Sequence, residues 1–365
     1  MTNKLRVGLL STAALDVPGS MRVYAELLSQ ALAAHAPDIE AHLIELAPAQ
    51  PRGGLSQRFE MLALPLRARR CRSENIDLWH ILDGSRAYLA EGLRGAPVVI
   101  TAHDIIPVLQ QRGRFPGAPT VGRAARWLWR RNGRAMRMAA LLICDSECTR
   151  RDVNDAFGRA GMARVVPLPV RPGLVANGGG ELTAREPGLI LHLGNNGFYK
   201  NRAQVLRIFA ALDRSLARRL VMIGPAPAPA LRELASALGI EAWVQWVEDA
   251  EDVQVANWYH RASLLVFPSL YEGYGWPVLE AMTFGLPVVC SNAGSLPEVA
   301  GDVAPCLAPD DLAGYVREIE WLLRDPAVAQ ARSEAGRRWA EGFGLERFAR
   351  DMSAAYRAAC DGVKR

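Results

Sequence analysis

Two glutamates, Glu272 and Glu280, bracket a glycine-rich stretch in the second half of the chain. Gly273 and Gly275 lie between them, and glycines let a phosphate approach the backbone closely. The free N–H groups of a helix that begins here would bind an anion. With Glu272 in the loop and Glu280 on the helix, the two carboxylates could hold two parts of one extended ligand. The alternatives are an ordinary loop carboxylate for Glu272 and a solvated helix face for Glu280.

A second glycine loop has the same design. The apolar run 189–193 predicts a buried strand, and the loop after it contains Gly194, Lys200 and Asn201. A helix pattern over 204–212 follows. Lys200 would supply a full positive charge to an anion such as a diphosphate, and a solvated lysine is the alternative.

Polar residues also follow apolar runs in the first half of the chain. Gly19 lies in the loop after the run 5–10, and His103 comes directly after the run 97–101. Ligands of parallel sheets bind at the carboxyl ends of the strands, so both residues would face a ligand. His103 could be a structural histidine, a general acid or base, or a group that positions a ligand. Ser146 could face the ligand or form a helix N-cap, and we favour the N-cap.

The elements around these residues alternate between strands and helices, which predicts parallel sheets with helices on their faces, an α/β fold. The length of 365 residues suits two domains, each with its own core. Prolines and glycines concentrate over 171–187 and predict a linker there. The expected strands are 5–10, 41–46, 76–80, 97–101, 141–144, 165–170, 189–193, 220–223, 243–247, 264–267 and 288–290.

The stretch 267–298 closely resembles the signature of retaining GT-B glycosyltransferases, in particular glycosyltransferase family 4. That family carries Glu-x7-Glu within PS-x-x-E-G-[FY]-G-x-P-x-x-E-A-M-x-x-G-x-P-V, and every fixed position is matched here. The resemblance implies two Rossmann-like domains whose parallel sheets face a central cleft. It places the acceptor-side domain at 1–170, the nucleotide-sugar domain at 188–345, and a C-terminal helix at 346–365 that crosses back to the first domain.

The resemblance also implies roles for individual residues. Glu272 would contact the donor sugar, Glu280 the ribose hydroxyls, and His103 would lie near the reacting sugar. Lys200 would stabilise the leaving diphosphate, and the base would lie near Val247. Further donor-binding residues are Gly19, Gly194, Asn201, Gly273, Tyr274, Gly275, Val278 and Leu279.

Two departures from the family pattern bear on the donor site. The family has paired cations at the second loop, but Tyr199 stands here where an arginine is usual. The sequence leaves open whether Arg202, two residues beyond Lys200, replaces that cation. Only Gly19 remains of the glycine cluster that the family often has in its first loop.

Composition limits the setting of the protein. Half of the residues are hydrophobic, no apolar run reaches the roughly 20 residues of a transmembrane helix, and the first residues lack a signal-peptide pattern. We therefore expect a cytoplasmic protein. The six cysteines form no Cys-x-x-Cys pair and no zinc site, so reduced, part-buried thiols are expected.

The stretch from Arg112 to Arg137 holds eight arginines and no acidic residue, with Trp127 and Trp129 among them. One interpretation is a solvated helix face. The other is docking to an anionic membrane surface, on the inner face of the plasma membrane. Nucleic acid is disfavoured because no base-reading motif accompanies the charge.

The expected function is transfer of a hexose, with mannose as our guess, from a GDP- or UDP-sugar to a glycan or lipid-linked acceptor. By family resemblance this would serve lipopolysaccharide or exopolysaccharide assembly with retention of anomeric configuration. The chain has no Asp-x-Asp triplet, so we expect no metal and no cofactor. The alternatives are a GT-B sugar-nucleotide epimerase and a non-catalytic nucleotide-sugar-binding or membrane scaffold protein. A glycosidase would need an acid and base pair across the sugar and is poorly supported.

Overall fold

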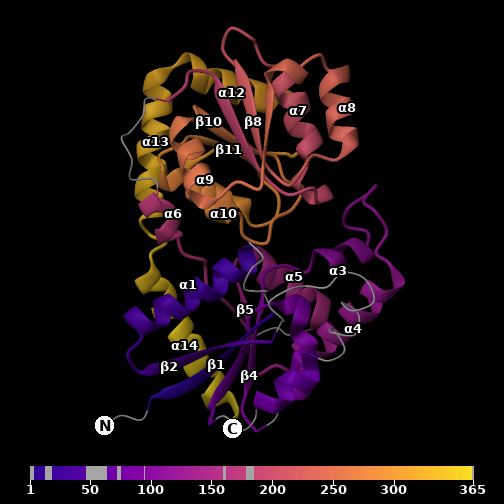
Figure 1. Ribbon diagram of the computed structural model, residues 1–365, viewed down its shortest axis with the longest axis vertical. Coiled ribbons are helices and arrows are strands. Elements are labelled where there is room, and N and C mark those ends of the chain that lie inside the picture. Colours follow the sequence, from indigo (N-terminus) through magenta and orange to yellow (C-terminus); the bar gives the residue numbers. More distant parts are fainter. Residues whose placement is uncertain are drawn as a thin grey trace. The chain divides into compact units, whose positions relative to one another are not determined.

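The computed structural model describes residues 4–12, 19–46, 64–71, 75–93, 95–158, 162–177 and 185–363. The chain divides into two compact units. Unit 1 comprises Met1–Pro169 and Gly344–Arg365, and unit 2 comprises Val170–Phe343. Each unit is a sheet flanked by helices (Figure 1).

Unit 1 contains a parallel sheet whose six described strands have the order β2-β1-β3-β4-β5-β6. The strands are β1 (Leu5–Ser11), β2 (Ile39–Glu45), β3 (Leu78–Ile81), β4 (Val98–Ala102), β5 (Leu141–Cys144) and β6 (Ala163–Val165). Strands β3 and β5 are buried along their whole length, as expected for a parallel sheet covered on both faces.

Helices surround this sheet. They are α1 (Ser20–His35), the 3-10 helix η2 (Gly84–Gly92), α3 (Ile106–Gln111), α4 (Arg123–Met138), α5 (Glu147–Phe157) and α14 (Leu345–Val363). Helix α14 comes after unit 2 in the chain, yet it packs against α1 and contacts β4 and β5 (Figure 1). Tyr356 and Phe348 of α14 are fully buried, so α14 is part of the unit 1 core.

Unit 2 repeats the design with the strand order β12-β11-β10-β7-β8-β9, again parallel at every described pair. The strands are β7 (Leu189–Leu193), β8 (Arg219–Gly224), β9 (Val244–Glu248), β10 (Leu264–Phe267), β11 (Val288–Ser291) and β12 (Cys306–Leu307). The central strand β7 has β10 on one side and β8 on the other.

The α-helices of unit 2 are α6 (Pro172–Asn177), α7 (Arg202–Ala211), α8 (Pro229–Ala237), α9 (Asp252–Arg261), α10 (Trp276–Thr283), α11 (Leu296–Ala300), α12 (Leu312–Arg324) and α13 (Pro326–Ala340). Short 3-10 turns are η3 (Phe198–Lys200), η4 (Glu241–Trp243) and η5 (Gly301–Val303). One core cluster joins the sheet to α7 and α12, with Ile190 and Val266 of the strands packed with Phe209 and Ile319 of the helices.

The α/β fold with two parallel sheets confirms the sequence prediction, with two local corrections. The last strand of unit 1, expected at 165–170, is β6 at Ala163–Val165. Pro167 and Pro169 lack the N–H that a sheet ladder needs, so the strand ends before them. The segment expected as a linker contains helix α6, and its residues 178–184 lie outside the described part of the chain.

Candidate functional site

Lys200 and Glu272 form a buried ion pair at the carboxyl edge of the unit 2 sheet. The Lys200 ammonium lies 2.9 Å from both carboxylate oxygens of Glu272. The two side chains are only 13% and 8% exposed, so Lys200 is not a solvated lysine. Lys200 ends η3 in the loop after β7, and Glu272 lies in the loop after β10. The pair therefore joins the two loops that the sequence singled out.

The loop that carries Glu272 is held in place by the segment after β11. The hydroxyl of Ser295 donates to the carbonyl oxygens of Glu272 and Tyr274, at 3.0 and 2.6 Å. Gly294 has a φ of +63°, and a Cβ there would lie 2.5 Å from the Glu272 carbonyl. A residue with a side chain would push the loop away, so Gly294 and Ser295 together fix where the Glu272 backbone lies.

Helix α10 begins directly after this loop. Gly275, its N-cap residue, has a φ of +104° that only glycine adopts readily, and a Cβ there would lie 2.6 Å from Leu296. Pro277 occupies the first turn, where a missing N–H costs nothing. Val278 and Leu279 are fully buried and anchor the helix in the core. The N–H groups of this first turn are therefore held at the same sheet edge as Lys200.

Glu280 lies on α10 but does not face solvent, so the solvated-face alternative is wrong: it is 4% exposed. Its carboxylate accepts from Nε of Arg171 at 2.5 Å and from the Tyr259 hydroxyl at 2.8 Å. Arg171 also donates to Asp252 at 3.0 Å. Burial opposes the charge on Arg171, but Glu280 and then Asp252 raise its pKa above the usual value. The Glu280 carboxylate is thus a hydrogen-bond acceptor with a fixed position, and the Arg171 cation balances its charge.

The loop after β7 is fastened to its neighbours by backbone and side-chain contacts. The Gly194 amide donates to Ile223 at the end of β8, at 3.0 Å. Asn201 adopts a left-handed conformation with a φ of +52°, and its side-chain amide donates to the Pro268 carbonyl at 2.9 Å. The Leu270 amide donates to the Tyr199 carbonyl at 2.7 Å. Val247, expected near the base, lies on β9 and pairs with β8.

In unit 1, His103 follows β4 with both ring nitrogens engaged. Nδ1 lies 2.6 Å from a carboxylate oxygen of Asp145, and Nε2 lies 2.9 Å from the Leu82 carbonyl. Burial alone would lower the pKa of His103, but Asp145 outweighs it and raises the pKa to about 9. Both acceptors are satisfied when both nitrogens carry hydrogen. His103 is therefore an imidazolium at neutral pH, a cation rather than a free base.

A chain of buried hydrogen bonds connects the surroundings of His103 to α14. The hydroxyl of Tyr356 lies 2.8 Å from Nδ1 of His80, whose Nε2 lies 2.7 Å from the Thr101 hydroxyl. Thr101 in turn lies 2.9 Å from the Tyr24 hydroxyl, and the Tyr24 ring meets the His103 ring edge-on with centroids 4.6 Å apart. Burial lowers the pKa of His80 to about 3, so His80 stays neutral beside the charged His103.

The other two unit 1 candidates lie at helix starts. Gly19 precedes α1, and its carbonyl accepts from the Arg22 and Val23 amides at 3.1 and 3.2 Å. Ser146 is the N-cap of α5 and accepts from the Thr149 amide at 3.1 Å, which confirms the N-cap interpretation.

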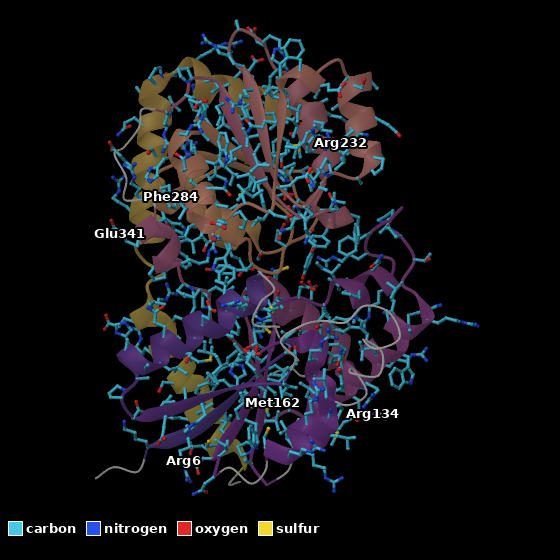
Figure 2. All side chains as sticks on the ribbon, viewed as in Figure 1. Arg6, Arg134, Met162, Arg232, Phe284 and Glu341 are labelled. Carbon is cyan, nitrogen blue, oxygen red and sulfur yellow. The ribbon has the colours of Figure 1, made fainter. Side chains whose placement is uncertain are left out.

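The basic stretch expected at Arg112–Arg137 is partly helix α4, which is sharply two-sided. Trp129 and Met136 are buried on one face, whereas Trp127 is 52% exposed on the other. Arg131 pairs with Glu91 at 2.6 Å and lies 4.9 Å from the Trp127 ring. We call the exposed residues Arg123, Arg126, Arg130, Arg134 and Arg137 the α4 arginine face; Figure 2 labels Arg134.

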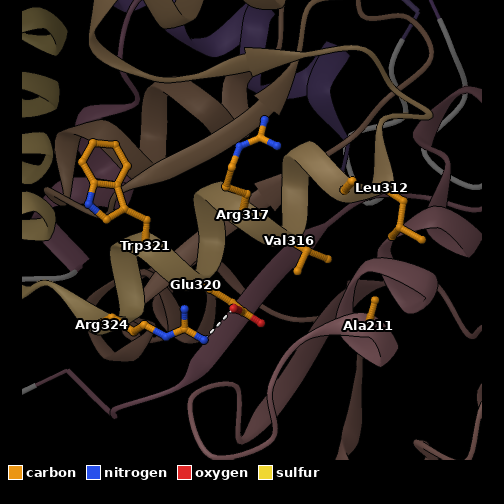
Figure 3. Close-up of a pocket in the computed structure, with 8 residues that line it drawn as sticks. Ala211, Leu312, Val316, Arg317, Glu320, Trp321 and Arg324 are labelled. Atoms are coloured by element: carbon orange, nitrogen blue, oxygen red, sulfur yellow. Dashed lines mark hydrogen bonds and ion pairs between the residues drawn. The ribbon is translucent and has the colours of Figure 1, made fainter.

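An open hollow of about 760 Å³ lies elsewhere on unit 2 (Figure 3). It is lined by Ala211, Leu312, Ala313, Val316, Arg317, Glu320, Trp321 and Arg324. Arg324 donates to Glu320 at 2.7 Å across this surface. Ala211 ends α7, which runs back from the carboxyl edge of the sheet, so the hollow does not coincide with the Lys200–Glu272 site.

Among the described residues, no group of three or more His, Cys, Asp or Glu side chains could hold a metal ion. Within the same residues, every helix is too short or too polar to cross a bilayer.

Sequence reasoning missed four residues that shape the site: Arg171, Tyr259, Gly294 and Ser295. Arg171 fell in the expected linker, and its partner Glu280 is 109 residues away in the sequence. No local pattern could have joined them. The Gly294-Ser295 pair, which begins four residues after the predicted strand 288–290, was a usable signal for another loop at the same sheet edge.

Two family models together match most of the chain. Residues 180–339 match the family of glycosyl transferases group 1, and residues 21–174 match glycosyltransferase family 4.

Individual proteins resemble parts of the chain. O-antigen chain mannosyltransferase B of Escherichia coli is 36% identical over 117 residues, which is 32% of this chain and 31% of that protein. An MMP α-(1→4)-mannosyltransferase of Mycolicibacterium hassiacum is 32% identical over 158 residues, covering 42% of this chain and 37% of the relative. The matched segments thus span about a third of each curated relative.

The whole chain resembles solved structures in fold. Sucrose-phosphate synthase from Thermosynechococcus elongatus superposes with a TM-score of 0.77, covering 97% of this chain and 98% of that one, at 19% identity.

Proposed function

Because the chain belongs to the GT-B glycosyltransferases of the group 1 and family 4 families, we propose that it is a retaining hexosyltransferase that uses a nucleoside-diphosphate sugar. The observation that carries this proposal is the Lys200–Glu272 ion pair beside the start of α10. An ammonium and a row of helix N–H groups suit a diphosphate leaving group.

In the proposed reaction, the bond between the sugar C1 and the diphosphate oxygen breaks while an acceptor oxygen bonds to C1 on the same face. The acceptor proton passes to the departing diphosphate. Lys200 and the α10 N–H groups stabilise the charge that develops on that diphosphate, a type of contribution that is often large in catalysis. Donor binding moves Lys200 toward the phosphate oxygens and leaves Glu272 to accept from sugar hydroxyls.

We propose the remaining donor contacts on the basis of the family resemblance. Glu280, oriented by Arg171 and Tyr259, would accept from the ribose hydroxyls. The glycine loops at Gly194 and Gly273 would admit the phosphates, and the backbone near Val247 would contact the base. In unit 1, His103 would contribute positive charge rather than act as a base, because both of its nitrogens are engaged.

We propose a mannosyl donor and an acceptor that is a glycan or a lipid-linked sugar, in lipopolysaccharide or exopolysaccharide assembly. The similarity to an O-antigen chain mannosyltransferase supports both. We further propose that the enzyme works in the cytoplasm and docks to anionic lipid through the α4 arginine face, with Trp127 at headgroup level.

The test is a thermal-shift panel of GDP, UDP, ADP and their sugar conjugates, followed by donor hydrolysis. A ligand at about one hundred times its Kd adds about 2.7 kcal/mol to the stability of the folded state. We expect one nucleotide series to raise the Tm and its sugar conjugate to be hydrolysed slowly. Binding without hydrolysis or transfer would favour a non-catalytic binder, and epimerisation of the free sugar nucleotide would favour an epimerase. No shift with any nucleotide would overturn the proposal.

A further inference from the structure

Arg202, the first residue of α7, is a buried cation with only part of its hydrogen-bonding capacity used. It is 4% exposed. Its Nη1 donates to the side-chain oxygen of Asn196 and to the Pro225 carbonyl. Nε and Nη2 are buried and have no hydrogen-bond partner among the residues that the structure describes. These two nitrogens share one edge of the planar guanidinium, the edge that binds two adjacent acceptors.

This arrangement is costly for a core position. The core-facing neighbours on α7 are Val205, Leu206 and Phe209, all apolar. An apolar side chain at 202 would bury itself without a desolvation penalty, whereas a charged group with unpaired donors destabilises the fold. Burial lowers the pKa of Arg202, in line with that penalty. A buried charged side chain with unpaired donors occurs chiefly at functional positions, where a ligand supplies the missing hydrogen-bond partner.

The direction of the Arg202 side chain distinguishes it from Lys200. Arg202 contacts Pro225, which follows β8, and its guanidinium lies 5.4 Å from the ring of Trp246 on β9. Lys200 instead pairs with Glu272, which follows β10. Strands β8 and β10 flank β7 on opposite sides, so the two cations diverge. Arg202 therefore does not extend the diphosphate site around Lys200 but lies toward β9, where the base is expected.

One exposed side chain, that of Asn196, contacts the Arg202 guanidinium. Asn196 is exposed and holds Nη1 on one side, while its own amide nitrogen donates to the Ala226 carbonyl at 2.7 Å. This single side chain bridges the loops after β7 and β8 above Arg202.

We propose that Arg202 reads the base of the donor nucleotide, with its Nε and Nη2 donating to O6 and N7 of a guanine. Guanine presents two adjacent acceptors on that edge, whereas adenine replaces one of them with an amino donor. Two oxygens of a diphosphate offer the same acceptor pair, but the divergence of Arg202 from Lys200 favours the base. This inference rests on the proposed function and narrows the donor to a GDP-sugar.

The first experiment uses the unaltered protein and isothermal titration calorimetry with GDP, 7-deaza-GDP, ADP, UDP and inorganic pyrophosphate. We expect GDP to bind most tightly. 7-Deaza-GDP, in which a C–H replaces the N7 acceptor, should bind roughly 2–10-fold more weakly, about half of the effect of a bidentate pair. Equal affinity for GDP and 7-deaza-GDP, or tighter binding of ADP or UDP than of GDP, would overturn the inference.

The second experiment repeats the titrations with Arg202→Gln and with Arg207→Gln, an exposed arginine of the same helix, as the matched control. Arg202→Gln should weaken GDP binding roughly 5–150-fold and leave ADP and UDP nearly unchanged, and Arg207→Gln should change nothing. Circular dichroism checks that each variant is folded.

The other outcomes each count against the inference. Equal weakening of all nucleotides and of pyrophosphate would place the Arg202 edge on the diphosphate. Unchanged affinities would mean that a buried water, and not the nucleotide, accepts hydrogen bonds from Nε and Nη2 of Arg202. Nucleotide binding without a preference for guanine overturns this inference alone, whereas failure of every nucleotide to bind overturns the proposed function as well.

Discussion

The Lys200 ammonium donates to both carboxylate oxygens of Glu272, each at 2.9 Å, and so links the loop after β7 to the loop after β10. Both side chains are almost fully buried, so each neutralises a buried charge that would destabilise the fold if it were unpaired. In the proposed reaction, the diphosphate competes with Glu272 for Lys200 and releases the carboxylate for a new partner. The ion pair would then couple diphosphate binding to the availability of Glu272.

Replacing Lys200 with Ala should therefore cost both stability and activity. Removing one partner of a buried pair leaves an unpaired charge and destabilises proteins by about 3–5 kcal/mol. Loss of a group that stabilises developing charge lowers kcat by roughly 100–1000-fold. Urea denaturation and transfer assays measure the two effects. The control is Lys4→Ala, at an exposed lysine directly before β1, which should change neither stability nor activity. Full activity in Lys200→Ala would refute the role of Lys200.

Glu280→Gln should weaken donor binding more than it alters the chemical step. The amide keeps a hydrogen bond to Tyr259 but loses the charge that faces Arg171 and the proposed ribose hydroxyls. Hydrogen bonds to charged groups contribute about 1.5–3 kcal/mol, so the Kd of the nucleoside diphosphate should rise roughly 10–150-fold. Calorimetry with the diphosphate and with its 2′,3′-dideoxy form checks this. If the carboxylate binds the ribose hydroxyls, the dideoxy ligand should bind the variant and the native protein with nearly the same affinity.

The charge on His103 should make stability fall at alkaline pH. Its folded-state pKa of about 9 is raised above the ordinary 6.5, so the unfolded chain releases this proton first. The contribution, about 3 kcal/mol, is complete below pH 6.5 and is lost as pH rises through 9. Urea midpoints of native protein and of His103→Gln between pH 6 and 10 should converge at the alkaline end. A constant gap across that range would show that His103 is neutral.

A chelator should leave the transfer rate within about twofold of its value in untreated enzyme, because Lys200 and the α10 N-terminus supply the positive potential. The measurement is the initial rate after dialysis against EDTA, with and without added Mg²⁺ or Mn²⁺. Complete loss of activity that a divalent cation restores would contradict this expectation.

Neutralising the α4 arginine face should release the protein from anionic vesicles. Arginines near such a surface contribute about 1 kcal/mol each, so changing Arg126, Arg130 and Arg134 to Ala should lower the partition coefficient roughly 100-fold. Co-sedimentation with vesicles that contain the anionic lipid phosphatidylglycerol measures this. A triple variant at exposed unit 2 arginines, Arg207, Arg218 and Arg338, removes the same charge and should bind normally. Equal loss in both would indicate non-specific attraction.

Local sequence signals predicted much of this structure, for physical reasons. The buried strand β10, the loop at Gly275 and the start of α10 at Pro277 depend on interactions between residues close in the chain. Such elements follow from burial periodicity, glycine conformation and the missing proline N–H. The GT-B fold is confirmed, and the roles of Glu272, Glu280 and Lys200 remain predictions.

What could not be predicted depends on contacts between distant residues. Arg171 meets Glu280 across 109 residues, and Tyr356 meets His80 across 276. A sequence pattern carries no record of which buried polar groups find each other. The same limit applies to Arg202. The sequence shows that this residue is an arginine, but it does not show that the side chain is buried and directed toward Trp246.

The place of α14 in unit 1 bears on the order in which the protein forms during synthesis. Unit 2 is continuous in the chain and can fold once its own residues have left the ribosome. Unit 1 needs Phe348 and Tyr356 to complete its core, and these are translated only after all of unit 2. A nascent chain arrested before residue 344 should therefore expose the apolar side of α1 and attract chaperones, although its first sheet has already been made.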